Sequence, residues 1–165
     1  PAVRFAELEE MIQICRLMWT QDAPTFTGKH FHITEAAAPP KPEIVPPVCI
    51  GAYGEQIGLP MVGRLADMWN ASTQGNVERW LVKRDIVRAS AEKSGRNPSD
   101  IHISLTVEKP LPNTDEESEM LRAELQTMAD HGVEHFVMDF GHPQSTEPVM
   151  RFVEQVLQPM KAARK

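Results

Sequence analysis

The sequence predicts an α/β protein with a parallel sheet. Four short apolar segments have the composition of buried strands, and each is followed by a segment whose apolar residues recur at three- and four-residue spacing. Alternating strands and helices of this kind form parallel sheets, because each helix carries the chain back across the sheet. At 165 residues the chain fits one domain, and four strand–helix units make half of an eightfold barrel or most of an open sheet.

A helix and a hairpin are predicted before these units. Apolar residues follow helical spacing from Val3 to Trp19. Acidic residues early in this helix suit the positive end of its dipole and predict no chemistry; they are Glu7, Glu9 and Glu10. Residues 25–33 alternate apolar and polar side chains around a central glycine, which predicts a hairpin. Its inward side is expected to consist of Phe26, Phe31 and Ile33.

The strand–helix units follow a proline-rich stretch. Residues 36–47 contain five of the 14 prolines, which predicts an extended connector on the surface. The apolar run Val48 to Ile50, closed by Gly51, predicts a buried strand, and helical spacing resumes over 57–65. The later elements are predicted strands over 66–70, 101–107 and 133–140, and predicted helices over 77–93, 114–131 and 147–161.

Charge and hydropathy exclude two classes of partner. Seventeen Lys and Arg against 23 Asp and Glu give a net charge of −6, which offers no electrostatic footprint for nucleic acid. No apolar run reaches the roughly 20 residues of a membrane span, and no segment resembles a signal peptide, so we expect a cytoplasmic protein without a membrane partner. The cysteines, Cys15 and Cys49, lie in apolar patterns typical of buried free thiols.

Histidine pairs raise the question of a metal site. His30 and His32 share one face of the predicted hairpin, whereas Gly132 breaks the helix between His131 and His135. No carboxylate or thiol is spaced to complete either pair, so we expect no metal. No Ser-His-Asp or Cys-His arrangement can be argued from spacing either, and the catalytic residues stay unassigned.

Polar residues stand at or just beyond the predicted strand ends. Ligands collect at the carboxyl ends of parallel strands, so these side chains are expected to reach one rim, and Asn70 is the one we assign to a ligand. Asp67 could equally cap a helix or accept from backbone amides. The full set is Asp67, Asn70, Glu108, Asp139 and His142.

A glycine-containing turn, Gly51-Ala52-Tyr53-Gly54-Glu55, follows the strand at 48–50. A turn from strand end to helix start presents backbone N–H groups and the positive end of the helix dipole to an anion, so a phosphate could bind there. Glycines that simply permit a tight turn explain the segment equally well, since neither a P-loop Lys-Ser/Thr nor a GxGxxG pattern follows.

Several motifs stand in a recognisable order: Arg4–Glu10, Phe26–Phe31, Pro46–Gly51, Ala66–Asn70 and Gly95–Pro98. In this order they resemble the luciferase-like monooxygenases, and in particular the branch that depends on the deazaflavin coenzyme F420. The resemblance runs from Arg4 to about Gly141 and implies a partial TIM-like (β/α)8 barrel, namely its last four βα units with a preceding helix and a small hairpin. Because the chain begins at Pro1, we expect one domain over 1–165 that is the C-terminal half of such a barrel.

The resemblance implies an oxidoreductase that transfers hydride between F420 and a small organic substrate. It places Asn70 at the barrel mouth, and it places the backbone of the glycine turn at the cofactor phosphate, through Gly51, Ala52, Tyr53, Gly54 and Glu55. The sequence departs from the family pattern there, because the family more often has further glycines followed by basic residues and Thr. An FMN-dependent monooxygenase is the alternative. A third hypothesis is a non-catalytic half-barrel, whose strand edges and apolar inner face would drive self-association into a homo-oligomer or be completed by another chain.

Overall fold

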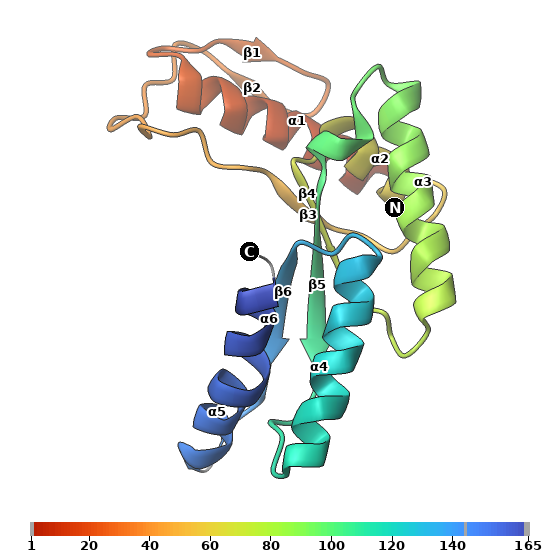
Figure 1. Ribbon diagram of the computed structural model, residues 1–165. Coiled ribbons are helices and arrows are strands. Elements are labelled where there is room, and N and C mark those ends of the chain that lie inside the picture. Colours follow the sequence, from red (N-terminus) through yellow and green to blue (C-terminus); the bar gives the residue numbers. More distant parts are fainter. Residues whose placement is uncertain (1, 144, 164–165) are drawn as a thin grey trace. The chain divides into compact units, whose positions relative to one another are not determined.

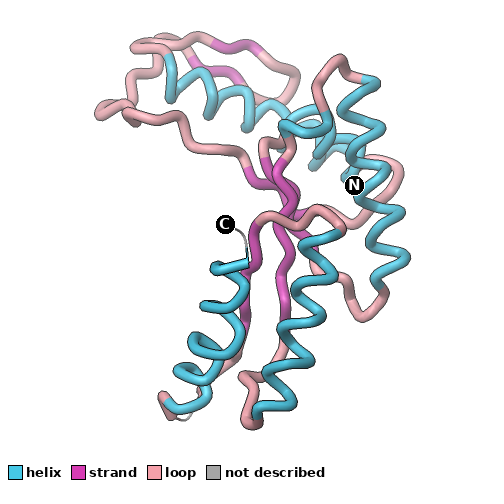
Figure 2. The backbone as a smooth tube through the Cα atoms, in the orientation of Figure 1, coloured by secondary structure: helices cyan, strands magenta, loops and turns pink. Residues whose placement is uncertain are grey.

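The computed structural model describes residues 2–143 and 145–163, and Pro1, at which the sequence begins, lies outside them. The elements follow the predicted order of a helix, a hairpin and then strands alternating with helices (Figures 1 and 2). Two compact units are formed. The first unit comprises Pro1–Trp69 and Val82–Ile101, and the second comprises Asn70–Leu81 and His102–Lys165.

The first unit opens with the helix and the hairpin. α1 spans Ala2–Thr20, and β1 (Phe26–Thr27) pairs antiparallel with β2 (His32–Ile33). The inward-facing prediction is wrong for Phe31, which is 36% exposed. Phe31 lies in the turn, where its carbonyl accepts the Gly28 N–H at 2.8 Å, and a turn residue does not continue the alternation of the strands.

Glu10 fastens the hairpin to α1. Its carboxylate accepts the backbone N–H groups of Lys29 at 2.8 Å, His30 at 2.9 Å and Phe31 at 2.8 Å. Desolvation acts to raise the pKa of Glu10, but the three hydrogen bonds and the charge of His30 together lower it below its ordinary value. Glu10, for which the sequence predicted no chemistry, therefore has a structural role.

The first strand–helix unit follows the proline-rich connector, and residues 34–48 contain no helix or strand. β3 spans Cys49–Gly51, α2 spans Gly58–Leu65 and β4 spans Met68–Ala71. α2 buries Leu59, Met61 and Val62. At Gly63 it approaches α3 (Val77–Lys93) closely, because a Cβ built on this glycine would lie 2.6 Å from the Val87 carbonyl oxygen.

The remaining elements match the predicted segments closely. They are β5 (His102–Glu108), α4 (Asp115–Asp130), β6 (His135–Asp139), α5 (Glu147–Phe152), the π-helical segment η2 (Val153–Leu157) and α6 (Gln158–Ala163). Thr114 caps α4, since its hydroxyl oxygen accepts the Glu117 N–H at 3.1 Å. The single helix predicted over 147–161 is thus a continuous helical stretch with one π-turn in its middle.

The main sheet confirms the predicted α/β class. Its parallel strands are ordered β3-β4-β5-β6, which is the order of the chain, as expected of successive βα units. β5 and β6 pair in register from Ser104 opposite His135 to Glu108 opposite Asp139. Among residues 2–143 and 145–163, no helix is both long and apolar enough to span a membrane.

The second unit buries one face of β5. Ile103, Leu105 and Val107 are at most 7% exposed and alternate with Ser104 and Thr106, so the apolar and the hydroxyl side chains point to opposite faces. α4 contributes further buried side chains to this unit, namely Ser118, Leu121, Leu125 and Met128.

Candidate functional site

The glycine turn stands at the carboxyl end of β3, in the first unit. Gly51 is the last residue of the strand, and the buried Ala52 offers its carbonyl to the Trp69 Nε1–H at 3.0 Å. This hydrogen bond fixes the start of the turn to the neighbouring strand. α2 begins only at Gly58, and the Leu59 N–H donates to the Gly54 carbonyl at 2.9 Å. Space is open beside Gly54, since a Cβ built there meets no atom within 4 Å.

A lysine of α3 lies beside this turn, and the sequence analysis missed it. The Nζ of Lys83 is 5.1 Å from the centroid of the Tyr53 ring, which is a cation–π distance. Lys83 is only 8% exposed, whereas Tyr53 is 38% exposed. Helical spacing gave a usable signal, because Lys83 stands four and eight residues before the buried Val87 and Ala91 and therefore on the apolar stripe of α3.

Asn70 belongs to the second unit, where it organises a chain of polar side chains. Its Oδ1 accepts the Thr106 hydroxyl at 2.9 Å, and its Nδ2 donates to the Ser104 Oγ at 2.7 Å. The same Oγ lies 3.0 Å from the His135 Nδ1. Both hydrogen-bonding ends of the amide are thus engaged within the sheet, where Asn70 orients the Thr106 hydroxyl.

These contacts make one face of β5 and β6 mainly polar. The hydroxyl-bearing face of β5 continues onto His135 and, two residues later, Val137, by the pairing register of the two strands. Val137, 41% exposed, is a large apolar side chain on a face otherwise formed by hydroxyl, amide and imidazole groups. Over β5 and β6 the apolar side chains other than Val137 lie on the opposite face.

A cavity of about 480 Å³ opens at the carboxyl ends of β4 and β5, within the second unit. The turn from β4 to α3 forms one side of it, with positive φ angles at Gln74 (50°) and Gly75 (76°). Asn76 then caps α3 by accepting the Arg79 N–H at 2.8 Å. The polar lining of the cavity includes Ser72, Thr73, Gln74, Thr106, Glu108 and Lys109.

The polar strand-end residues do not all reach one rim. Glu108 and Asp139 end β5 and β6 and lie opposite each other in the register, as predicted, and the exposed His142 follows three residues after β6. The prediction that Asp67 reaches the carboxyl rim is wrong, because β4 begins at Met68 and Asp67 therefore precedes the strand. Asp67 is also only the second residue of the strand predicted over 66–70, so the predicted bounds already place this carboxylate at the amino-terminal end.

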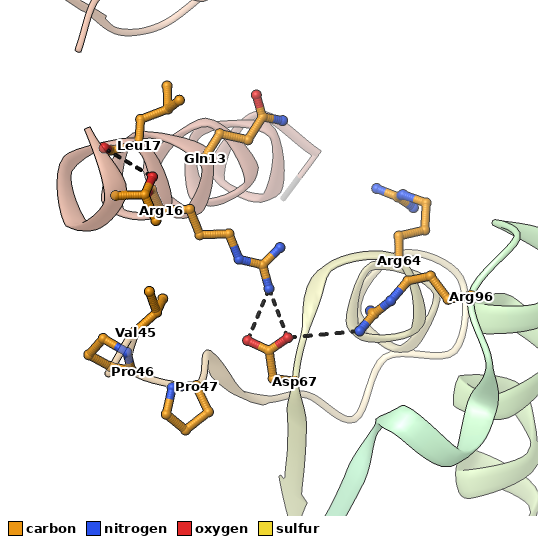
Figure 3. A pocket seen from close by; sticks show the side chains of 10 residues that line it. Gln13, Arg16, Leu17, Val45, Pro46, Pro47, Arg64, Asp67 and Arg96 are labelled. Carbon is orange, nitrogen blue, oxygen red and sulfur yellow. Dashed lines mark hydrogen bonds and ion pairs between the residues drawn. The ribbon is translucent and has the colours of Figure 1, made fainter. Parts of the chain in front are cut away.

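Asp67 instead holds together the amino-terminal end of β4, as Figure 3 shows. It accepts from the Arg16 Nη2 at 3.0 Å and from the Val48 N–H at 2.8 Å, and an Arg96 Nη2 lies 3.9 Å away. These side chains border a cavity of about 840 Å³, at the end of the strands opposite to where ligands collect. The carboxylate-to-backbone alternative considered for Asp67 is confirmed.

The histidine and cysteine side chains form no metal centre in the described ranges. Within residues 2–143 and 145–163 no three His, Cys, Asp or Glu side chains are placed to hold an ion. Both cysteines are free thiols, but Cys49 is exposed rather than buried. Partial desolvation nevertheless raises the pKa of the Cys49 thiol above its ordinary value.

Parallel strands that alternate with helices, with a turn and a polar cavity at carboxyl strand ends, are features of the α/β barrel class, whose members bind ligands at those ends. Residues 1–156 match the model of the family described as luciferase-like monooxygenase. The chain belongs to this family.

The chain is similar to two curated relatives that act on different substrates. It is 28% identical over 120 residues to an F420-dependent glucose-6-phosphate dehydrogenase of Amycolatopsis mediterranei, covering 67% of this chain and 36% of that protein. It is 29% identical over 98 residues to an F420-dependent hydroxymycolic acid dehydrogenase of Mycobacterium tuberculosis, covering 59% and 26%. The chain therefore spans 36% or less of the length of these two relatives.

Solved structures of luciferase-like TIM-barrel enzymes share the fold. An F420-dependent secondary alcohol dehydrogenase, in complex with an F420-acetone adduct, superposes with a TM-score of 0.73 at 18% identity, over 94% of this chain and 62% of that chain. A riboflavin lyase with modified FMN superposes with a TM-score of 0.57 at 15% identity, over 74% and 32%. The predicted partial barrel architecture is thereby confirmed.

Proposed function

We propose that this chain carries the later strand–helix units of an F420-dependent oxidoreductase, which transfers hydride between the deazaflavin and a small organic substrate. The observation that carries the proposal is the similarity to F420-dependent dehydrogenases, at 28% identity over 120 residues within the same family. Two such relatives differ in their substrates, which supports the cofactor more strongly than any one substrate. The proposal takes residues 1–165 as one domain that is the C-terminal half of the barrel.

The glycine turn fits the phosphate of this cofactor. It stands at a carboxyl strand end, and the space beside Gly54 admits a ligand close to the backbone. Lys83 supplies a positive charge next to the turn. In the proposed site Gly51–Glu55 contacts the phosphate, while the deazaflavin ring supplies the hydride chemistry when bound and the protein supplies orientation and electrostatics.

Asn70 acts in this proposal through Thr106. The Thr106 hydroxyl donates its one hydrogen bond to Asn70. Its oxygen can therefore only accept a hydrogen bond from a group in the cavity that Thr106 lines. A ligand group at this position is expected to donate a hydrogen bond, as a substrate hydroxyl does. Asn70 is thus a positioning residue, and its earlier assignment as a direct cofactor contact remains a prediction. No side chain of this chain is assigned the role of acid or base.

A fluorescence titration of the purified chain with F420, and separately with FMN, tests the proposal. We expect saturable quenching of F420 fluorescence, and weaker or no binding of FMN. Saturable binding of FMN alone would replace the proposal by the flavin-dependent alternative. If neither binds while light scattering detects a dimer or larger species, the non-catalytic assembly hypothesis is favoured. The fold does not decide between the cofactors, because a riboflavin lyase with modified FMN shares it.

A further inference from the structure

The side chain of Lys83 is buried without a partner of opposite charge. It is 8% exposed, and among the described residues no group accepts a hydrogen bond from its Nζ or forms an ion pair with it. Its ammonium group lies over the Tyr53 ring, with 5.1 Å between Nζ and the ring centroid. Lysines are almost never buried to this degree unless they are paired, because the ammonium group is strongly hydrated in water.

A cation–π contact offsets only part of the cost of removing an ammonium group from water. The surface lysine Lys93, at the end of the same helix, meets no such cost because it is exposed. Among the described residues, no carboxylate pairs with this ammonium group. An anion bound beside it would supply the missing partner.

The surroundings of Lys83 allow an anion to arrive. The Tyr53 ring that contacts its ammonium group is 38% exposed and belongs to the glycine turn. The next residue, Gly54, leaves open space where other residues carry a side chain. A ligand that lies against this backbone thus comes close to the positive charge of Lys83, whose ammonium group lies over the Tyr53 ring.

We propose that Lys83 and Tyr53 form a side-chain subsite for a phosphate-type anion at the glycine turn. Lys83 provides the charge, and the Tyr53 ring holds the ammonium group in place before the ligand binds. This subsite supplies the basic group that the turn sequence itself lacks. The inference rests on the proposed function only in taking the anion to be the phosphate of F420.

The test compares Lys83→Met, which removes the charge, with Lys83→Arg, which keeps it, and with Lys93→Met as a matched control on α3. Affinities are measured by fluorescence for F420 and for the deazaflavin core without its phosphate-containing tail. We expect Lys83→Met to weaken F420 binding about tenfold or more and to leave binding of the core unchanged. Lys83→Arg should stay within about threefold of the original chain, and Lys93→Met should match it. Inorganic phosphate should compete with F420 in the original chain and not in Lys83→Met.

Equal F420 affinity in Lys83→Met and the original chain would overturn the inference, as would an equal loss for F420 and for the core. If the original chain binds FMN instead of F420, and Lys83→Met weakens FMN but not riboflavin, the proposed cofactor fails while the subsite stands. If the original chain binds no phosphate-bearing ligand, the subsite fails.

A thermal unfolding experiment separates binding from folding. Methionine keeps most of the apolar length of the side chain and removes its charge, so the Tm of Lys83→Met should stay close to that of the original chain. A large drop in Tm in Lys83→Met, absent in Lys93→Met, would make Lys83 a structural residue and overturn the inference.

Discussion

Replacement of Gly63 by alanine should destabilise the first unit, because α2 and α3 meet there without room for a side chain. The added Cβ would lie 2.6 Å from the Ser90 Cβ, 2.6 Å from the Val87 carbonyl oxygen and 2.8 Å from the Ala91 nitrogen. Ordinary contacts between carbon atoms lie at about 3.5–4.0 Å, so the helices must separate by roughly 1 Å. Two of the three obstacles are backbone atoms, which no rotamer change can move.

The size of the effect follows from two opposing terms. Overpacking a well-packed site costs about 1–3 kcal/mol, whereas alanine favours a helix over glycine by about 1 kcal/mol. We expect a net loss of up to about 2 kcal/mol, which lowers the Tm by up to roughly 8 °C in a chain of this size. Urea unfolding followed by circular dichroism measures the loss directly.

Gly58→Ala is the matched control in the same helix. Its nearest neighbours would be the Ala52 Cβ at 3.2 Å and the Phe5 ring at 3.6 Å, so the change demands a shift of only a few tenths of an ångström. This variant should unfold within about 0.5 kcal/mol of the original chain. Equal stability of the two alanine variants would refute the reasoning from close helix approach.

Three further predictions concern the hairpin and the polar face. Gly28→Ala should free the hairpin from α1, because the added Cβ would lie 2.4 Å from the Glu10 Oε2. We expect faster proteolysis within residues 26–33 of this variant, and an unchanged rate would contradict the prediction. The folded pKa of Glu10 is lowered, so its contribution to stability is present above the ordinary value of 4.5 and is lost as the pH falls through the folded pKa. The amide resonances of residues 29–31 should titrate with a midpoint below 4.5, and a midpoint above it would exclude the proposed hydrogen bonds. Thr106→Val removes the hydrogen-bond donor to Asn70 and should lower the free energy of unfolding in urea by about 1 kcal/mol. Thr106→Ser keeps the donor and should lower it less. An equal loss of stability in both variants would attribute the effect to packing and not to the hydrogen bond.

Local patterns predicted the elements well where the spacing was long and regular. α3 spans Val77–Lys93 as expected, because its spacing persists over several turns and ends at a glycine and proline signal. β4 is short, and its start was placed two residues too early. Asp67 lies at the amino-terminal end of both the predicted and the observed strand, so its place away from the carboxyl rim could have been inferred from the predicted bounds.

The candidate site was less predictable, because its key contacts join residues far apart in sequence. The turn Gly51–Glu55 could be found from its glycines, but the contact of Lys83 with Tyr53 depends on how α3 packs. Glu10 likewise accepts from amides about 20 residues away, which helical spacing does not reveal. The polar face of β5 was visible as alternation in the sequence, yet the hydrogen bonds of Asn70 to that face require the strand pairing.

The most direct test of the central claim uses the single tyrosine of the chain, because Tyr53 lies in the glycine turn. Incorporation of 3-fluorotyrosine gives one fluorine resonance, which is followed by NMR during addition of F420. If F420 binds at the turn, this resonance shifts saturably, with the same midpoint as the quenching of F420 fluorescence. Saturable quenching with an unmoved fluorine resonance would place the cofactor elsewhere, and the absence of both responses would contradict F420 binding by this chain.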